Sequence, residues 1–262
     1  MKKRIHSLLH GLLLLVLYLF LLGPIIVVFI VSFDSRPYLA FPPASWSLES
    51  YRQVLDNAAF LRASWVSLWL GVATAVLALG AGVAACLAMR RMPARPKGVL
   101  SWLFVSPLMV PNIVIGVALL LILSHFGLLD TYAGLVLAHF GITIPYVVRT
   151  VSMSLQSLDA RCEEAAQMLG ANRWRVFWRI TFPLIRPGLI AGAAMAFLIS
   201  FDEAVISLFV SGTQVVTLPV EIYRYIEYRT DPQVAALSVL LILVSLAVTV
   251  LIEKVVGLRR AL

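Results

Sequence analysis

Charged residues are scarce in this sequence: Asp, Glu, Lys and Arg make up 13% of its 262 residues, whereas hydrophobic residues make up 61%. Soluble domains carry about 25% charged residues, which cover their water-facing surface. The composition therefore excludes a soluble globular protein and predicts an integral membrane protein.

Cysteine is nearly absent as well. Cys86 lies in an apolar segment and Cys162 in a charged loop, so neither a disulfide framework nor a C-x-x-C metal site is expected. The sequence also lacks a P-loop, a His-Glu-x-x-His motif and a Gly-x-Ser-x-Gly motif. We therefore expect no catalytic residue, no metal site and no ATP bound in a P-loop of this chain.

Six apolar segments are long enough to cross a hydrocarbon core of about 30 Å, which takes roughly 20 residues. They predict an all-α polytopic bundle of six transmembrane helices, in a single domain over residues 1–262. Proline is expected to kink the first segment at Pro24 and the third at Pro107 and Pro111, while Pro145 interrupts the fourth. The segments cover residues 8–33, 63–89, 99–123, 131–151, 188–210 and 234–252.

Basic residues are distributed unevenly among the loops. All but five of the 21 Lys and Arg residues lie at the two termini, after the second segment, or between the fourth and fifth segments. Cytoplasmic loops carry this excess, so we expect both termini to be cytoplasmic. The net charge of +8 thus reflects topology and not a nucleic-acid partner. The opposite face is mildly negative, which weakly favours a cationic solute.

The longest charged interruption lies between the fourth and fifth segments. Asp159 is suited to cap a helix over residues 160–169, and Gly170 is suited to the left-handed residue that ends it. Asn172 is suited to cap a second helix, which Pro183 and Pro187 are expected to end. Its basic side chains are expected to contact lipid headgroups: Arg173, Arg175 and Arg179. The sequence predicts a helix–turn–helix at a membrane surface.

Two adjacent acids, Asp202 and Glu203, lie in the fifth segment, which contains no basic residue. A carboxylate inside a membrane is costly unless it faces water or a partner. In a continuous helix Ser200, Glu203 and Ser207 share one face. We expect these four residues to line a substrate pathway. The alternative is that the acids cap a helix end or pair with Arg224 or Arg229.

Two features of the predicted helices each have two interpretations. His139 in the fourth segment is either a cofactor ligand or a packed or cavity-facing side chain. The small residues of the second segment favour close helix packing, either within one subunit or at a subunit interface. These residues are Gly71, Ala75, Ala78, Gly80, Gly82 and Ala84.

The charged loop contains Glu164-Ala165-Ala166, Gly170 after three further residues, and then Ile180 and Pro183. With this spacing it resembles the "EAA" loop in permease subunits of bacterial ABC importers, except that Phe182 replaces the family's usual Leu. The resemblance implies a type I importer permease, multi-pass in the bacterial inner membrane, with coupling helices over about 159–179. It also implies that a separate ATPase docks on Glu164, Ala165, Ala166 and Gly170.

Three further stretches resemble the spermidine/putrescine branch of these permeases: Ser106–Pro111, Phe201–Glu203 and Thr217–Pro219. The implied function is import of a polyamine or another small cationic solute, with ferric iron, an opine or another small solute as alternatives. The implied partners are a homologous second permease, two ATPase copies that bind ATP and Mg²⁺, and a periplasmic solute-binding protein. This chain would itself bind no cofactor. The rival classes are a membrane-embedded enzyme and a scaffold without transport.

Overall fold

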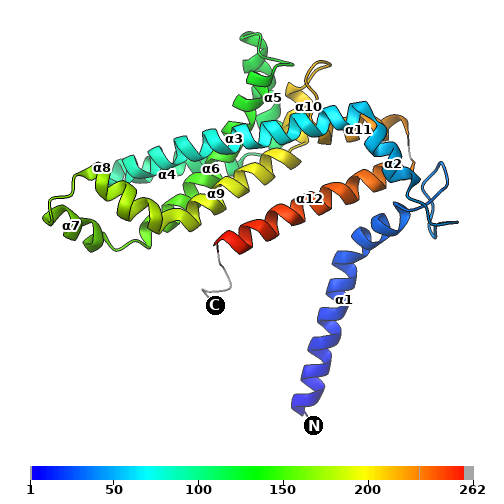
Figure 1. Ribbon diagram of the computed structural model, residues 1–262, viewed down its shortest axis with the longest axis horizontal. Helices are drawn as coiled ribbons and strands as arrows, with labels where there is room; N and C mark the ends of the chain where they lie inside the picture. Colours follow the sequence, from blue (N-terminus) through cyan, green and yellow to red (C-terminus); the bar gives the residue numbers. More distant parts are fainter. Residues whose placement is uncertain (1, 230, 257–262) are drawn as a thin grey trace. The chain divides into compact units, whose positions relative to one another are not determined.

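The computed structural model describes residues 2–229 and 231–256, in which helices are the only extended regular elements (Figure 1). Five of these helices are long and apolar enough to cross a membrane, and one sharply bent helix pair makes a possible sixth. The prediction of an all-α polytopic membrane protein is therefore confirmed. Five of the basic residues that were counted at the termini cannot be placed in the structure. The side chains of Lys2, Lys3 and Arg4 are not described, and Arg259 and Arg260 lie outside the described residues.

The helices in chain order are α1 (Lys2–Val31), α2 (Glu49–Asp56), α3 (Ala58–Arg90), α4 (Ala94–Val105), η1 (Ser106–Met109), α5 (Asn112–His125), α6 (Tyr132–Gln156), α7 (Ala160–Met168), α8 (Arg173–Val176), η2 (Phe177–Thr181), α9 (Phe182–Asp202), α10 (Val205–Val210), α11 (Leu218–Tyr228) and α12 (Pro232–Val256). The chain forms two compact units. Unit 1 comprises Met1–Leu61 and Ile222–Val244, and unit 2 comprises Arg62–Glu221 and Ser245–Leu262.

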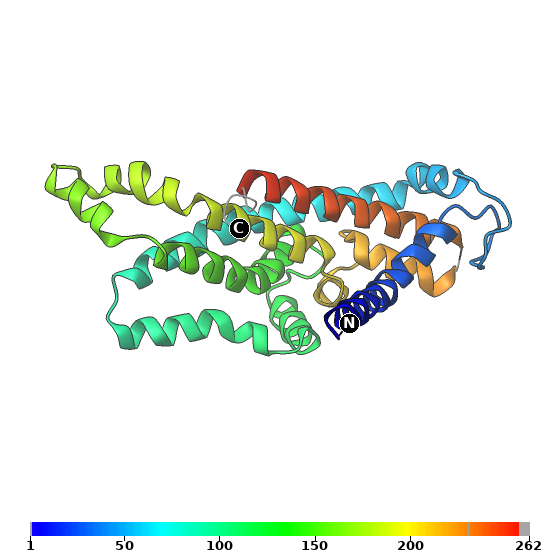
Figure 2. The same cartoon turned by 90° about the horizontal axis from the view of Figure 1, so that it is seen from below.

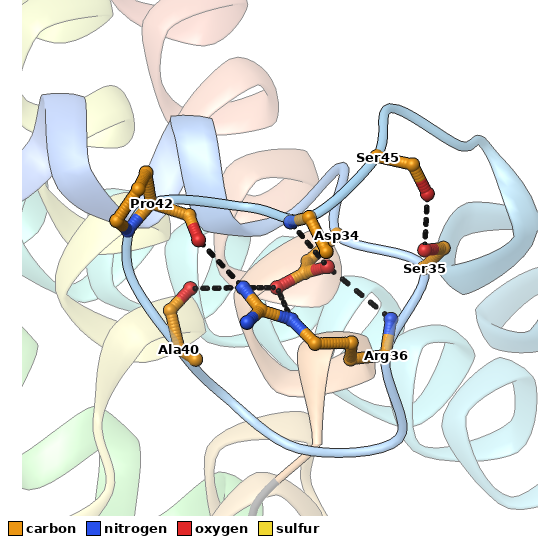
Figure 3. A network of polar contacts seen from close by, with 7 residues as sticks. Asp34, Ser35, Arg36, Ala40, Pro42 and Ser45 are labelled. Carbon is orange, nitrogen blue, oxygen red and sulfur yellow. Dashed lines mark hydrogen bonds and ion pairs between the residues drawn. The ribbon is translucent and has the colours of Figure 1, made fainter.

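In unit 1, the part of α1 from His10 to Val31 is strongly apolar and mostly exposed, as a lipid-facing helix is. It continues through Pro24. Beyond it, the Asp34 carboxylate is buried and accepts hydrogen bonds from Arg36 Nε (2.8 Å) and Nη2 (2.6 Å) (Figure 3). Arg36 Nη2 also donates to the Pro42 carbonyl at 2.6 Å. The Arg36 guanidinium lowers the pKa of Asp34, and this ion pair holds the loop after α1 together.

The core of unit 2 is formed where α3, α6 and α9 pack closely through small residues. A Cβ atom on Gly82 of α3 would lie 2.7 Å from Val147 Cγ1 of α6, and one on Gly71 would lie 2.9 Å from Phe197 Cδ2 of α9. Packing within one subunit is therefore confirmed for these two glycines. Gly80 is exposed and meets no atom within 4 Å, so a subunit-interface role stays open there.

The third predicted segment is broken rather than merely kinked. The helical stretch Ala94–Met109 meets α5 at 103°, with Val110 extended between them. Pro111 causes the break, because it has no N–H to donate and disfavours helical backbone in the residue before it. The predicted disturbance of the segment over 99–123 is therefore present, but at Pro111 it is a full break and not a kink within one helix. By contrast, α6 runs through Pro145 without interruption.

The expected stop at Pro183 and Pro187 was also wrong, because α8, η2 and α9 form one run from Arg173 to Asp202. In the π-type turn η2, the Phe182 N–H donates to the Phe177 carbonyl. Pro183 then lies in the first turn of α9, where a missing N–H is tolerated. The actual break comes later, at Glu203 and Ala204, within the segment that was predicted to be continuous.

Candidate functional site

The charged loop forms the predicted helix–turn–helix. The Asp159 side chain accepts the Arg161 N–H at 3.0 Å, and the Asn172 side chain accepts the Arg175 N–H at 2.8 Å. Gly170 adopts φ +85°, the left-handed conformation expected for a helix stop. Figures 1 and 2 show α7 and α8 at one end of unit 2, away from α5 and α10.

The surface of α7 is apolar as well as charged. Glu164 and Ala165 are exposed, Ala166 is half-buried, and Met168 and Leu169 are each 89% exposed. Large apolar side chains exposed on a charged loop indicate a contact surface for another molecule. Glu164, Ala165 and Ala166 thus lie together on the accessible helix α7, and Gly170 lies in the turn that follows it.

Glu163, one residue before this motif, has a different environment. Its Oε1 atom accepts hydrogen bonds from Arg90 Nη1 at 2.8 Å and from Thr181 Oγ1 at 2.5 Å. The three residues border a cavity of about 710 Å³. The sequence alone does not reveal this cluster, because Arg90 lies 73 residues from Glu163 in the chain.

The two helix breaks of unit 2 meet at Glu203. Its Oε1 atom accepts the Ile206 N–H at 3.0 Å and so caps α10, while Oε2 accepts a hydrogen bond from Asn112 Nδ2 at 3.2 Å. Glu203, Asn112, Pro107 and Tyr146 line a small cavity of about 60 Å³. The capping alternative therefore holds for Glu203, and the same side chain also faces a polar cavity.

Asp202 is exposed and lies outside the set of residues that line this cavity. Ser200 and Ser207 are instead buried against His139, whose Nδ1 atom lies 2.8 Å from Ser200 Oγ and whose Nε2 atom lies 3.0 Å from Ser207 Oγ. The packed interpretation of His139 is confirmed. Its ring connects α9 to α10 across the break at Glu203.

Asp130, between α5 and α6, was not among the residues that the sequence predicted to be important. Its carboxylate accepts backbone N–H groups from four consecutive residues after α10, Gly212 to Val215, at 2.9–3.1 Å. Desolvation raises the pKa of Asp130, but these four N–H groups outweigh it and hold the pKa below its ordinary value. Asp130 thus fixes the loop that follows α10.

Within the described residues no group of His, Cys, Asp or Glu side chains is arranged to hold a metal ion. Unit 2 instead has two places where another molecule can bind. One is the exposed face of α7, and the other is the carboxylate-lined break between α9 and α10.

Comparison with known proteins gives a consistent picture. A family model described as "Binding-protein-dependent transport system inner membrane component" matches residues 77–259. The spermidine/putrescine transport system permease protein PotC of Haemophilus influenzae is 32% identical over 241 residues, covering 92% of this chain and 93% of that protein. The putrescine transport system permease protein PotI of Escherichia coli K12 is 34% identical over 237 residues, covering 86% and 82%.

Solved structures show the same fold. A bacterial ABC transporter involved in the import of the acidic polysaccharide alginate has a chain similar at TM-score 0.76 and 16% identity, covering 98% of this chain and 97% of that one. The inward-facing MetNI methionine ABC transporter is similar at TM-score 0.63 and 16% identity, covering 76% and 94%. At this identity the likeness concerns the fold alone.

Proposed function

Because this chain belongs to the binding-protein-dependent transport system inner membrane component family of ABC importer permeases, we propose that it moves a polyamine or another small cationic solute into the bacterial cytoplasm. Permeases of this family are transporter subunits and not enzymes, and a separate subunit hydrolyses ATP. The near full-length similarity to PotC and PotI supports the polyamine class. Ferric iron or an opine is the second candidate, carried by the same architecture.

The observation that carries the proposal is the position of Glu203. A carboxylate inside a membrane segment has to face water or a partner, and Glu203 borders a cavity at two facing helix breaks. Asp202 lies beside it and is exposed. A protonated polyamine presents ammonium groups, which donate hydrogen bonds to carboxylates and are attracted by their charge. Asp202 and Glu203 are thus the proposed substrate-pathway residues.

The same proposal assigns the partners. A second permease completes the pathway, two ATPase copies bind ATP and Mg²⁺, and a periplasmic protein delivers the solute. The termini and α7 face the cytoplasm, in keeping with the distribution of Lys and Arg. The surface formed by Glu164, Ala165 and Ala166 of α7 and by Gly170 in the turn after it docks on the ATPase. ATP-driven movement of that subunit changes the access of the pathway by rigid-body rearrangement.

Uptake by the complete importer, reconstituted in vesicles with labelled putrescine or spermidine, tests the proposal. Asp202→Asn and Glu203→Gln should each reduce uptake at least about tenfold, since one charge-assisted contact is worth about 1.5–3 kcal/mol. Asp56→Asn, an exposed acid at the end of α2, is the matched control and should transport normally. Wild-type uptake by both test variants would contradict the pathway assignment. Uptake of ferric iron or an opine in place of polyamines would contradict the solute class.

A further inference from the structure

Glu163 and Glu164 are adjacent in α7 but face different surroundings. Consecutive side chains on a helix point about 100° apart. Glu164 is exposed, whereas the Glu163 side chain is 18% exposed and paired with Arg90. Only one of the two acids is therefore directed toward a docking partner, while the other points back into unit 2.

A single oxygen of Glu163 joins three elements. Arg90 is the last residue of α3, and Thr181 is the last residue of η2, which leads directly into α9. Both donate to Glu163 Oε1. We name this cluster of Glu163, Arg90 and Thr181 the Glu163 junction. It connects α7 to two candidate membrane spans, at the last residue of the span Ala58–Arg90 and within the span Arg173–Asp202.

A cavity beside the Glu163 junction leaves few other contacts through which α7 can move α3. Its volume is about 710 Å³, and its other lining residues include Gln167 of α7 and Trp174 of α8. An open cavity cannot transmit a displacement. Movement of α7 therefore reaches α3 only through side-chain contacts at the edge of the cavity. The Glu163 junction lies on that rim, and its charge-assisted contacts resist separation more strongly than neutral ones.

Both helices reached by the junction lead to the candidate substrate pathway. From Arg90 to Gly71, α3 covers about 29 Å at 1.5 Å per residue, and Gly71 contacts Phe197 of α9. The helix α9 itself ends at Asp202, next to Glu203. A displacement applied at α7 thus has a continuous path of packed helices to these acids.

We infer that Glu163 is a positioning residue that transmits movement of α7 to α3 and α9, while the neighbouring Glu164 serves docking. The inference rests on the proposed docking of an ATPase on α7. Glu163 stays bonded within the chain, so its removal uncouples transport from ATP hydrolysis without releasing the ATPase.

The test uses the complete importer, with its ATPase and binding protein, reconstituted in vesicles. Two quantities are measured: co-purification of the ATPase, and the number of solute molecules taken up per ATP hydrolysed. Glu163→Gln and Arg90→Gln should retain the ATPase and lower uptake per ATP about five- to tenfold, within the usual range of coupling between sites. The exchanged pair, Glu163→Arg with Arg90→Glu, should restore much of that loss. Arg91→Gln, the exposed neighbour of Arg90, should transport normally.

Thr181→Val provides a milder variant that keeps the ion pair and removes one hydrogen bond, so it is expected to assemble normally. It should lower uptake per ATP about two- to threefold. Normal uptake per ATP in Glu163→Gln and Thr181→Val would overturn the inference. Release of the ATPase by Glu163→Gln would overturn it too, by making Glu163 a docking residue. A wild-type chain that binds no ATPase would instead refute the proposed function itself.

Discussion

Replacing Asp130 with Asn should loosen the loop after α10 without changing the backbone that holds residue 130. Asp130 adopts φ +55°, a conformation that Asn tolerates nearly as well as Asp. Asn retains one carbonyl oxygen but places an NH2 group where the second carboxylate oxygen was. The Thr213 N–H donates to that second oxygen at 2.9 Å and, with Asn in this orientation, would face another donor. The substitution thus removes the charge and one hydrogen-bond acceptor while keeping the backbone conformation of residue 130.

The magnitude follows from the hydrogen bonds. Hydrogen bonds to a charged group contribute about 1.5–3 kcal/mol each when well shielded. The four N–H groups share one carboxylate, and Thr213 and Gln214 are exposed, so the contributions do not add. We expect a total loss of about 1–3 kcal/mol. Asp130→Ala should lose about 1 kcal/mol more, because Ala disfavours a positive φ.

Amide hydrogen exchange of the detergent-solubilised chain measures this loss directly. The amides of residues 212–215 should exchange about five- to 150-fold faster in Asp130→Asn, the equivalent of 1–3 kcal/mol. Amides in the middle of α6 should be unchanged and serve as the internal control. Wild-type exchange at all four loop amides in Asp130→Asn would refute the argument that this carboxylate holds the loop.

The pH dependence has a definite sign. The folded pKa of Asp130 lies below its ordinary value, so its contribution is fully present above an unfolded pKa of about 3.9. It is lost as the pH falls through the folded pKa. Protection of residues 212–215, corrected for intrinsic exchange, should therefore be constant between about pH 5 and 8 and decline below about pH 4.

Three further predictions concern single contacts. His139→Ala removes both serine contacts and leaves a cavity, so it should destabilise the solubilised chain by about 2–4 kcal/mol; an unfolding curve equal to that of the exposed control His125→Ala would contradict this. Gly170→Ala should weaken ATPase co-purification, because holding Ala at a positive φ costs about 1–2 kcal/mol; equal recovery with Gly170→Ala and with Gly98→Ala, at an exposed glycine of α4 whose added Cβ would meet no atom within 4 Å, would disprove it. Arg36→Gln removes the group that lowers the pKa of Asp34 and should make the loop over residues 34–46 more sensitive to protease, with an unchanged cleavage rate as the opposing result.

Sequence reasoning succeeded where the interaction is local. Asp159 and Asn172 cap helices through N–H groups two and three residues away, and Gly170 meets a backbone requirement of its own position. The interactions that were missed join residues far apart in the chain. Glu163 and Arg90 are separated by 73 residues, and Glu203 and Asn112 by 91. Without an alignment, spacing and composition say nothing about which distant residues meet.

The helix breaks show a related limit. Pro111 was identified as a disturbance because proline acts on its own neighbours, although the break is sharper than a kink. Pro183 was expected to end a helix, but the π-type turn before it places it in a first turn, where it is tolerated. The break at Glu203 contains neither proline nor glycine. It is stabilised by the Glu203 carboxylate and by His139 from another helix, which a proline-based search does not detect.

The chain contains two pairs of adjacent acids, and in each pair one side chain points inward and one outward. Glu163 and Glu203 both bond helices of the same unit together, while Glu164 and Asp202 are exposed. Reduced uptake in Glu203→Gln can therefore come from two changes, the loss of a solute contact and the weakening of the cap on α10. Asp202→Asn has only the first.

The difference predicts how the two variants respond to solute concentration. If Asp202 contacts the solute, Asp202→Asn should raise the solute concentration needed for half-maximal uptake and leave thermal unfolding unchanged. Glu203→Gln should also lower the unfolding temperature, because it weakens a helix cap worth about 1 kcal/mol. An Asp202→Asn importer with unchanged solute dependence and reduced stability would reverse the assignment, making Asp202 the structural acid of the pair.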